Sequence, residues 1–478
     1  MAKITKKPSE KLTVKHIIGY GCGDAGGVVG LYMVSGFMTR FLQVNLQVNA
    51  GILATMLLIW NIWDAVNDPL MGTIMDMSFA KAKPGKDKFR PWILASIPII
   101  MIGMIAFYSV PSKLDGFAMV AAAFVLKIVY EAGYTMMNIG MGSLLGNMSK
   151  NDNERATLSS ARGFGATIAG MVGGFLISQC LAKFGTSNEG YAKTSMVLAV
   201  VGGIVLFLHY FLTEERNKAN PAQIQEKTEE EKNAEKFKIS DIWNIITKNR
   251  AFLALVLHSI SIMGVQALSQ GATSYMYIDV LKNVGMQGYY SVLSTGLMIV
   301  ILTAAPILTK KWDLVAIIRT CLMIGFVAFA GLLAYALMTE PMNAWVFLIW
   351  FALASACVTV SVQMQWGLVA ESIDYNEYLS GKRNEGTIYG FFSLSRRVGQ
   401  TIANSASVLI IAGIGYDASL TNAGLDQAPS TIAGIKIMVI ACPMVAALLS
   451  WLCFTFIWNI NKDVRAKMAD WKAAKAGK

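Results

Sequence analysis

Two carboxylates inside an apolar stretch are the side chains of this chain with the most evident chemistry. Asp64 and Asp68 stand four residues apart in the segment IWDAVNDPL (62–70), whose surroundings are otherwise apolar. On a helix, residues four apart lie one above the other, so both carboxylates share a face with Asn67 beside them. A carboxylate near the middle of a bilayer costs at least roughly 2.5–3.5 kcal/mol on insertion scales. The pair therefore predicts a partner, and a bound cation or proton is the natural one.

Pro69 adds to this prediction, because it has no N–H and leaves the carbonyl of Ala65 as a further oxygen donor. If the cation is sodium, Asp64 and Asp68 are its metal ligands. The alternative is a structural ion pair with a Lys or Arg of a neighbouring helix. The residues by themselves leave both interpretations open.

The composition is that of a membrane protein. Of 478 residues, 55% are hydrophobic and only 15% are charged, against roughly 25% in soluble domains. A membrane-spanning helix needs about 20 apolar residues. Twelve stretches meet this need: 17–39, 50–76, 91–111, 117–145, 157–184, 191–213, 250–279, 286–310, 315–337, 342–372, 386–415 and 432–459. The fold class predicted is an all-α integral membrane protein with twelve transmembrane helices.

The basic residues predict the topology. The net charge of +11 is concentrated before residue 16, between 81 and 90, between 216 and 238, and after 461. An even number of crossings separates these segments, so they lie on one side, and the positive-inside rule makes both termini cytoplasmic. The charge therefore does not predict nucleic-acid binding, and the lipid bilayer is the expected environment.

One polar segment divides the chain. Residues 214–249 are dense in charges of both signs and cannot lie in lipid. The predicted organisation is an N-terminal six-helix half (1–213), a cytoplasmic central loop (214–249), a C-terminal six-helix half (250–459) and a basic cytoplasmic tail (460–478). Two six-helix halves are the layout of a major facilitator transporter, with the substrate site between the halves at mid-membrane.

Other motifs carry little chemistry. The six cysteines show no CxxC or Cys/His spacing, and the three histidines are isolated near span ends, so no cofactor, zinc site or catalytic constellation is predicted. No cleavable signal peptide is expected, because the first span is too long for one. Gly21, Gly23 and Gly26 match G-x-G-x-x-G without a preceding strand, so a helix-packing role is favoured over nucleotide binding.

The chain resembles the glycoside–pentoside–hexuronide:cation symporters, the family of melibiose permease. The resemblance covers nearly the whole chain and is carried by GYGCGD, IWDAVNDPLMG, FRPW, YTMMNIGMGSL, ERATLSSARGFG and ESIDYNEYLSGKRNEGTIYG, in this order. It implies the major facilitator fold and coupled uptake of a sugar or glycoside with a cation.

By this resemblance the cation site consists of Asp64, Asp68, Asn67, Thr135 and Asn138. Asn138 is a departure, since the family has an acid there, and its loss makes sodium binding less certain and favours a proton. Glu131, seven residues earlier, shares roughly the same helix face. It either compensates for the lost acid or forms a structural pair with Lys127.

The resemblance also implies a sugar site of Asp24, Val28, Tyr134, Arg162, Trp366 and Arg397. Val28 departs from the family, which has an acid there, and Asp24 lies one turn earlier on the same face. Charged groups form the stronger hydrogen bonds to hydroxyls. The aromatic rings, Tyr389 included, offer apolar contact to the sugar or serve only in packing.

A third group of charges lies at the cytoplasmic end of the tenth predicted span. Glu371, Asp374 and Glu377, with Lys382 and Arg383 after them, are either a solvated loop or, as the family resemblance implies, part of a salt-bridge gate. Arg90 and Arg155, at other cytoplasmic ends, favour the gate.

The function predicted is secondary active transport in a bacterial inner membrane. A proton or sodium ion at the acidic pair increases the affinity for a sugar or glycoside, and the effect is reciprocal. Carboxylates that share a site favour protonation of one, whereas amide and carbonyl oxygens suit sodium. A uronic-acid glycoside is the alternative substrate, because Val28 removes an acid while Arg162 and Arg397 remain. A membrane enzyme or a transporter-derived sensor are the alternative classes; an enzyme is disfavoured because the acids lie inside spans.

Overall fold

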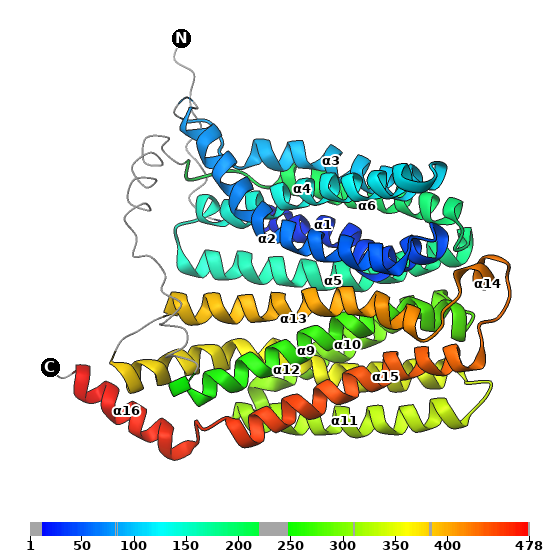
Figure 1. Ribbon diagram of the computed structural model, residues 1–478. Coiled ribbons are helices and arrows are strands. Elements are labelled where there is room, and N and C mark those ends of the chain that lie inside the picture. Colours follow the sequence, from blue (N-terminus) through cyan, green and yellow to red (C-terminus); the bar gives the residue numbers. More distant parts are fainter. Residues whose placement is uncertain are drawn as a thin grey trace, which may run out of the picture. The chain divides into compact units, whose positions relative to one another are not determined.

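The computed structural model describes residues 12–81, 83, 85–218, 247–308, 311–381 and 385–476. Within these residues every regular element is a helix, and there is no strand (Figure 1). Ten of the described helices are long and apolar enough to cross a membrane. The predicted all-α membrane class is therefore confirmed. Two further predicted spans correspond to helices, α10 (Gly285–Leu308) and α13 (Glu385–Gly413), that are not among these ten.

The helices form two compact units. The first unit contains Met1–Val48 and Ile59–Ala234, and the second contains Asn49–Leu58 and Glu235–Lys478.

The first unit is built from long, nearly uninterrupted helices. They are α1 (Val14–Arg40) with the short π-helix η1 (Phe41–Asn45), α2 (Ala50–Ala80) from Ile59 onward, α3 (Arg90–Ser109) with the short 3-10 helix η2 (Pro111–Lys113), α4 (Gly116–Met148), α5 (Asp152–Phe184) and α6 (Asn188–Leu212). Helix α1 packs against α5 and α6, and α3 packs against α4 and α6.

Glycines bring α1 into backbone contact with its neighbours. A Cβ at Gly165 of α5 would lie 2.1 Å from the carbonyl oxygen of Gly21, and a Cβ at Gly26 would meet Leu206 and Gly202 of α6. In lipid, small residues permit such close approach, and this confirms the packing role predicted for the glycines of α1. The contact with α5 also determines which α1 side chains can reach α5.

A buried carboxylate caps the first turn of α3. Glu215, in the segment after α6, is 4% exposed and accepts hydrogen bonds from the backbone N–H groups of Lys88 (2.9 Å), Phe89 (2.6 Å) and Arg90 (3.0 Å). The amide of Asn147, near the end of α4, donates a fourth at 3.1 Å. The first N–H groups of a helix have no partner within the helix, and a negative charge is favourable at that end. Glu215 therefore joins α3, α4 and the chain after α6.

The second unit contains α9 (Arg250–Tyr275), η3 (Met276–Val280), α10, α11 (Leu314–Met338), α12 (Ala344–Ser380), α13, α14 (Ala418–Asn422), α15 (Pro429–Leu452), η4 (Cys453–Ile457) and α16 (Lys462–Ala476). Helix α9 packs against α13 and α15, α11 against α12 and α15, and α10 against α12. A Cβ at Gly399 of α13 would lie 2.8 Å from the carbonyl oxygen of Ile260, so the backbones of α9 and α13 touch.

Candidate functional site

The acidic pair lies on α2 as the spacing predicts. Helix α2 continues through Pro69, and Asp64 and Asp68 therefore lie one turn apart, both half-buried. The hydroxyl of Thr73 donates to the carbonyl oxygen of Pro69 at 2.8 Å, which supplies a hydrogen bond in the turn after the proline.

Three of the predicted cation ligands are linked by hydrogen bonds. The Nδ2 of Asn67 donates to the Oγ1 of Thr135 at 3.0 Å, and this hydroxyl donates to the Oδ1 of Asp68 at 3.3 Å. Asn67 is 2% exposed and Thr135 is 7% exposed. The chain of bonds connects α2 to α4 and orients one carboxylate of the pair.

A buried ammonium lies over the ring of Trp60, one turn before the other carboxylate on α2. Lys127 of α4 is 5% exposed, forms an ion pair with Glu131 one turn later, and lies over the Trp60 ring at 5.5 Å. The charge of Asp64 also acts on this ammonium. Of the two interpretations of Glu131, the structure contains the pair with Lys127, while the second oxygen, Oε2, is buried without a hydrogen-bond partner among the described residues.

The predicted sugar-site arginine of α5 has an acidic partner. The Nε of Arg162 lies 2.8 Å from the Oδ2 of Asp24, and its Nη2 lies 3.4 Å from the Oδ1. The same Nη2 donates to the Oδ1 of Asn138 at 3.1 Å. Asn138, which the resemblance assigns to the cation site, is thus hydrogen-bonded to a residue of the predicted sugar site. The backbone contact between Gly21 and Gly165 makes this pairing of α1 with α5 possible.

Tyr134 of α4 lies between the two groups of residues. The charges of Asp24, Arg162 and Asp68 all act on its hydroxyl, and its ring packs 3.2 Å from where a Cβ of Gly27 would be. Val28 is half-buried on α1, one turn after Asp24. In the first unit, the predicted cation and sugar residues are therefore neighbours.

In the second unit, Trp366 is part of an aromatic cluster that includes an arginine. Trp366 of α12 stacks on Tyr389 of α13 with ring centroids 5.4 Å apart, and meets Phe392 edge-on at 5.4 Å. The guanidinium over the Trp366 ring, at 5.0 Å, belongs to Arg396 and not to the predicted Arg397, which is exposed. Residues 389, 392 and 396 follow i, i+3, i+7 spacing, so helical periodicity is the signal that indicates Arg396.

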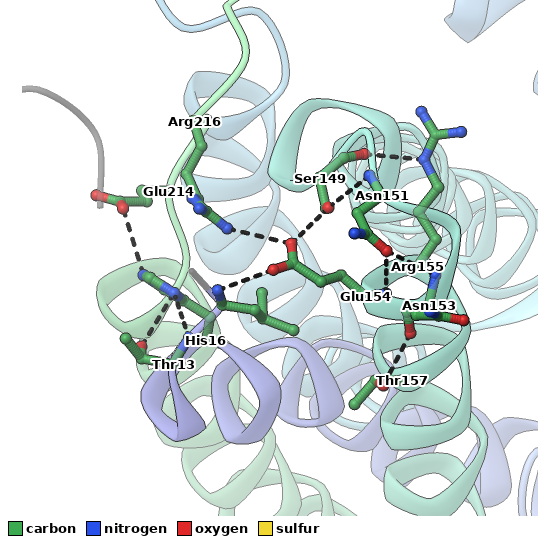
Figure 2. A network of polar contacts seen from close by, with 11 residues as sticks. Thr13, His16, Ser149, Asn151, Asn153, Glu154, Arg155, Thr157, Glu214 and Arg216 are labelled. Atoms are coloured by element: carbon green, nitrogen blue, oxygen red, sulfur yellow. Dashed lines mark hydrogen bonds and ion pairs between the residues drawn. The ribbon is translucent and has the colours of Figure 1, made fainter. Parts of the chain in front are cut away.

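The first-unit residues assigned to the gate are bonded within their own unit. The Nη1 of Arg90 lies 3.0 Å from Asp87, its Nη2 donates to the carbonyl oxygen of Tyr210 at 3.0 Å, and its guanidinium lies 4.5 Å from the Tyr210 ring centroid. The Nε of Arg155 donates to the carbonyl oxygen of Ser149 at 2.8 Å, as Figure 2 shows.

Figure 2 also shows Glu154 as the centre of a polar network. Its carboxylate accepts from the backbone N–H of Leu12 at 3.1 Å and from the hydroxyl of Ser149 at 2.5 Å, and lies 3.5 Å from the Nη1 of Arg216. His16 lies 3.3 Å from Glu214 in the same network. The start of α1, the α4–α5 connection and the segment after α6 are thereby joined.

The acidic end of α12 pairs with the C-terminal helix α16. Glu371 forms an ion pair with Arg465, which also lies 2.7 Å from Asp313, and Asp374 lies 2.8 Å from Lys472. The hydrogen bond with Glu371 raises the pKa of Arg465 above its ordinary value. Glu377 is buried at 9% exposure. Lys382 and Arg383 lie outside the described residues.

Four residues of these networks were not assigned to a site from the sequence. The sequence indicates only that four charged residues lie in polar segments or near the ends of spans: Glu215, Glu154, Arg465 and Lys472. Their partners are 62 to 152 residues away in no recurring pattern, apart from the local Ser149–Glu154 bond, so spacing carries no signal for them. No group of three or more His, Cys, Asp or Glu side chains in the described part of the chain is arranged to hold a metal ion. Sodium at α2 would therefore require neutral oxygens beside the carboxylates.

Comparison with known proteins places the chain in a family. Residues 19–462 match the model of the MFS/sugar transport protein family. An uncharacterized symporter of Bacillus subtilis (strain 168), YnaJ, is 25% identical over 95% of this chain and 93% of its own length. The glucuronide carrier protein homolog of Escherichia coli (strain K12) is 26% identical, covering 94% of this chain and 93% of the relative. The putative sulfoquinovose importer of the same strain is 23% identical, covering 95% and 92%.

The fold is shared with solved transporters. A bacterial homologue of the iron transporter ferroportin, in an inward-facing state, superposes with a TM-score of 0.62 at 13% identity, covering 93% of this chain and 98% of the other. The family resemblance inferred from the motifs is confirmed by the match over residues 19–462. The chain belongs to the MFS/sugar transport family of the major facilitator superfamily, and is a multi-pass membrane symporter and not an enzyme.

Proposed function

We propose that this protein is a proton-coupled symporter of a sugar or glycoside that works by alternating access in a bacterial inner membrane. Twelve spans with both termini cytoplasmic, and a salt-bridge gate that includes Arg90, Arg155, Glu371, Asp374 and Glu377, are part of the proposal. Support for sugar transport comes from the family match and from the hydrogen-bonding side chains near Arg162.

The observation that carries the choice of proton is the ammonium of Lys127. It is buried, is paired with Glu131 and is acted on by Asp64. A sodium ion approaching Asp64 would meet a positive charge already there, and two cations close together in a low-dielectric interior repel strongly. A proton requires only that one carboxylate be neutralised, and carboxylates that share a face favour this.

Uptake into proteoliposomes tests the coupling ion. With the membrane potential clamped, an inward proton gradient should drive sugar accumulation and a protonophore should abolish it. A sodium gradient without a pH gradient should drive none. Uptake that requires sodium and ignores the protonophore would refute proton coupling. Binding of the sugar with neither accumulation nor counterflow would indicate a transporter-derived sensor.

Lys127→Gln should shift the coupling preference towards sodium. Removing the ammonium leaves Asp64 and Glu131 without their shared cation, so the affinity for sodium should rise about tenfold or more. Stimulation of sugar binding by sodium in the purified variant measures this. Lys193→Gln is the matched control, because Lys193 is 52% exposed and pairs with Glu189 on the surface. An unchanged sodium response in Lys127→Gln would mean that the ammonium does not exclude sodium.

A uronic-acid glycoside is the second candidate substrate. The relatives named for glucuronide and for sulfoquinovose take acidic sugars by name. In this chain Asp24 compensates the charge of Arg162, so the first unit offers no excess positive charge at that position. An acidic substrate would need a cation elsewhere.

A further inference from the structure

We infer that Arg396, held on the face of Trp366, is the binding group for a single negative charge on the substrate, either a carboxylate or a sulfonate. The inference rests on the proposed transport of a sugar and adds the charge of that sugar.

The half-buried guanidinium of Arg396 has few polar partners. Its Nε is buried without a hydrogen-bond partner among the described residues, and its Nη2 reaches the Sδ of Met263 at 3.6 Å. A thioether sulfur is a weak acceptor. No carboxylate of the described residues pairs with Arg396, whereas Arg162 has Asp24 and Arg465 has Glu371.

An aromatic surface lies against the guanidinium. Trp366 lies beneath it, with Tyr389 stacked on the same indole and half exposed. Stacking on an indole stabilises an Arg while leaving the edge of the guanidinium available. This edge is a fork of N–H donors that matches two oxygens of a carboxylate or sulfonate. The ring of Tyr389 offers an apolar face to the sugar that carries the acid.

The backbone contact between α9 and α13 determines which face of α13 lies against α9. Gly264 and Gly399 let the two helices touch, and each lies close in sequence to a residue of the cluster: Met263 next to Gly264, and Arg396 three residues before Gly399. A rotation of α13 would separate the backbones. Contacts with Trp366 and Met263 restrict the side chain before a ligand binds, so less side-chain freedom is lost on binding.

Binding to the purified protein in detergent, without any ion gradient, tests the inference. The probes are methyl β-D-glucuronide, methyl β-D-glucoside and methyl α-sulfoquinovoside, each measured by calorimetry. Wild-type protein should bind at least one acidic probe about tenfold to a hundredfold more tightly than the glucoside, since hydrogen bonds to a charged group are strong. The two acidic probes distinguish a carboxylate from a sulfonate.

Arg396→Gln should remove this preference and leave affinity for the glucoside within about twofold, which also shows that the variant is folded. Arg396→Lys should keep part of the preference, because it keeps the charge but loses the fork. Arg250→Gln is the matched control, since Arg250 is exposed and donates only to the carbonyl oxygen of Phe456 among the described residues.

Equal binding of acidic and neutral probes by the wild type would overturn the inference, and so would an unchanged preference for the acidic probe in Arg396→Gln. If Arg396→Gln binds no probe, the comparison is made with Arg396→Lys: a preference for the acidic probe in that variant supports the inference, and equal binding of all probes overturns it. A protein that accumulates the glucoside and ignores both acids refutes only this inference. A protein that accumulates no sugar under any gradient refutes the proposed transport itself.

Discussion

Asp68→Asn is expected to abolish cation-driven accumulation of sugar while leaving expression and downhill sugar binding intact. Asp68 accepts a hydrogen bond from Thr135, which in turn is bonded to Asn67, so an amide fits the site but carries no negative charge and cannot take up a proton. Without coupling between the two ligands, the accumulation ratio should fall to about one. Asp64→Asn should have the same effect, and it also removes a negative charge that acts on Lys127.

The measurement is steady-state uptake in proteoliposomes under an inward ion gradient, beside equilibrium exchange of the same sugar. Asp76→Asn is the matched control, because Asp76 lies later on α2, is 52% exposed and pairs with Lys88. This variant should accumulate sugar normally. Either Asp64→Asn or Asp68→Asn concentrating sugar at the wild-type level would show that the assignment of the coupling site is wrong.

Among substitutions that remove a single buried charge in the first unit, Glu215→Gln is expected to cause the largest loss of stability. The carboxylate accepts from three backbone N–H groups at the start of α3 and from Asn147. A Gln in its place loses the charge and turns an N–H₂ group towards these donors. The free energy of unfolding should fall by roughly 2–4 kcal/mol, the combined scale of a lost helix cap and of a lost charged hydrogen bond.

Thermal unfolding of the purified protein in detergent measures this loss as a lower melting temperature. Glu189→Gln provides the comparison, because Glu189 is an exposed residue of the same unit whose partner is a neighbouring surface lysine. Its melting temperature should match that of the wild type. If Glu215→Gln and Glu189→Gln melt together, Glu215 does not stabilise the start of α3.

The helices and the acidic pair could be predicted from the sequence because the signals for them are local. A run of about 20 apolar residues is sufficient for a span, and each of the twelve predicted stretches overlaps a described helix. Spacing of four residues was sufficient to place Asp64 and Asp68 on one face of α2. Glycine pairs such as Gly21 and Gly165 were recognisable as packing residues, but not as a specific contact, because a helix can present a small residue to any neighbour.

Which charges meet was decided only by the tertiary structure. Asp24 pairs with Arg162 from 138 residues away, Glu215 caps a helix that begins 125 residues earlier, and Arg465 reaches Glu371 across 94 residues. Arg396, and not its neighbour Arg397, lies on Trp366, because the rotation of α13 is set by its backbone contact with α9. The sequence determined which elements form and which charges must find partners, since burial of an unpaired charge is costly. The choice among the available partners depends on helix rotation and close approach, which arise only when all the helices pack together.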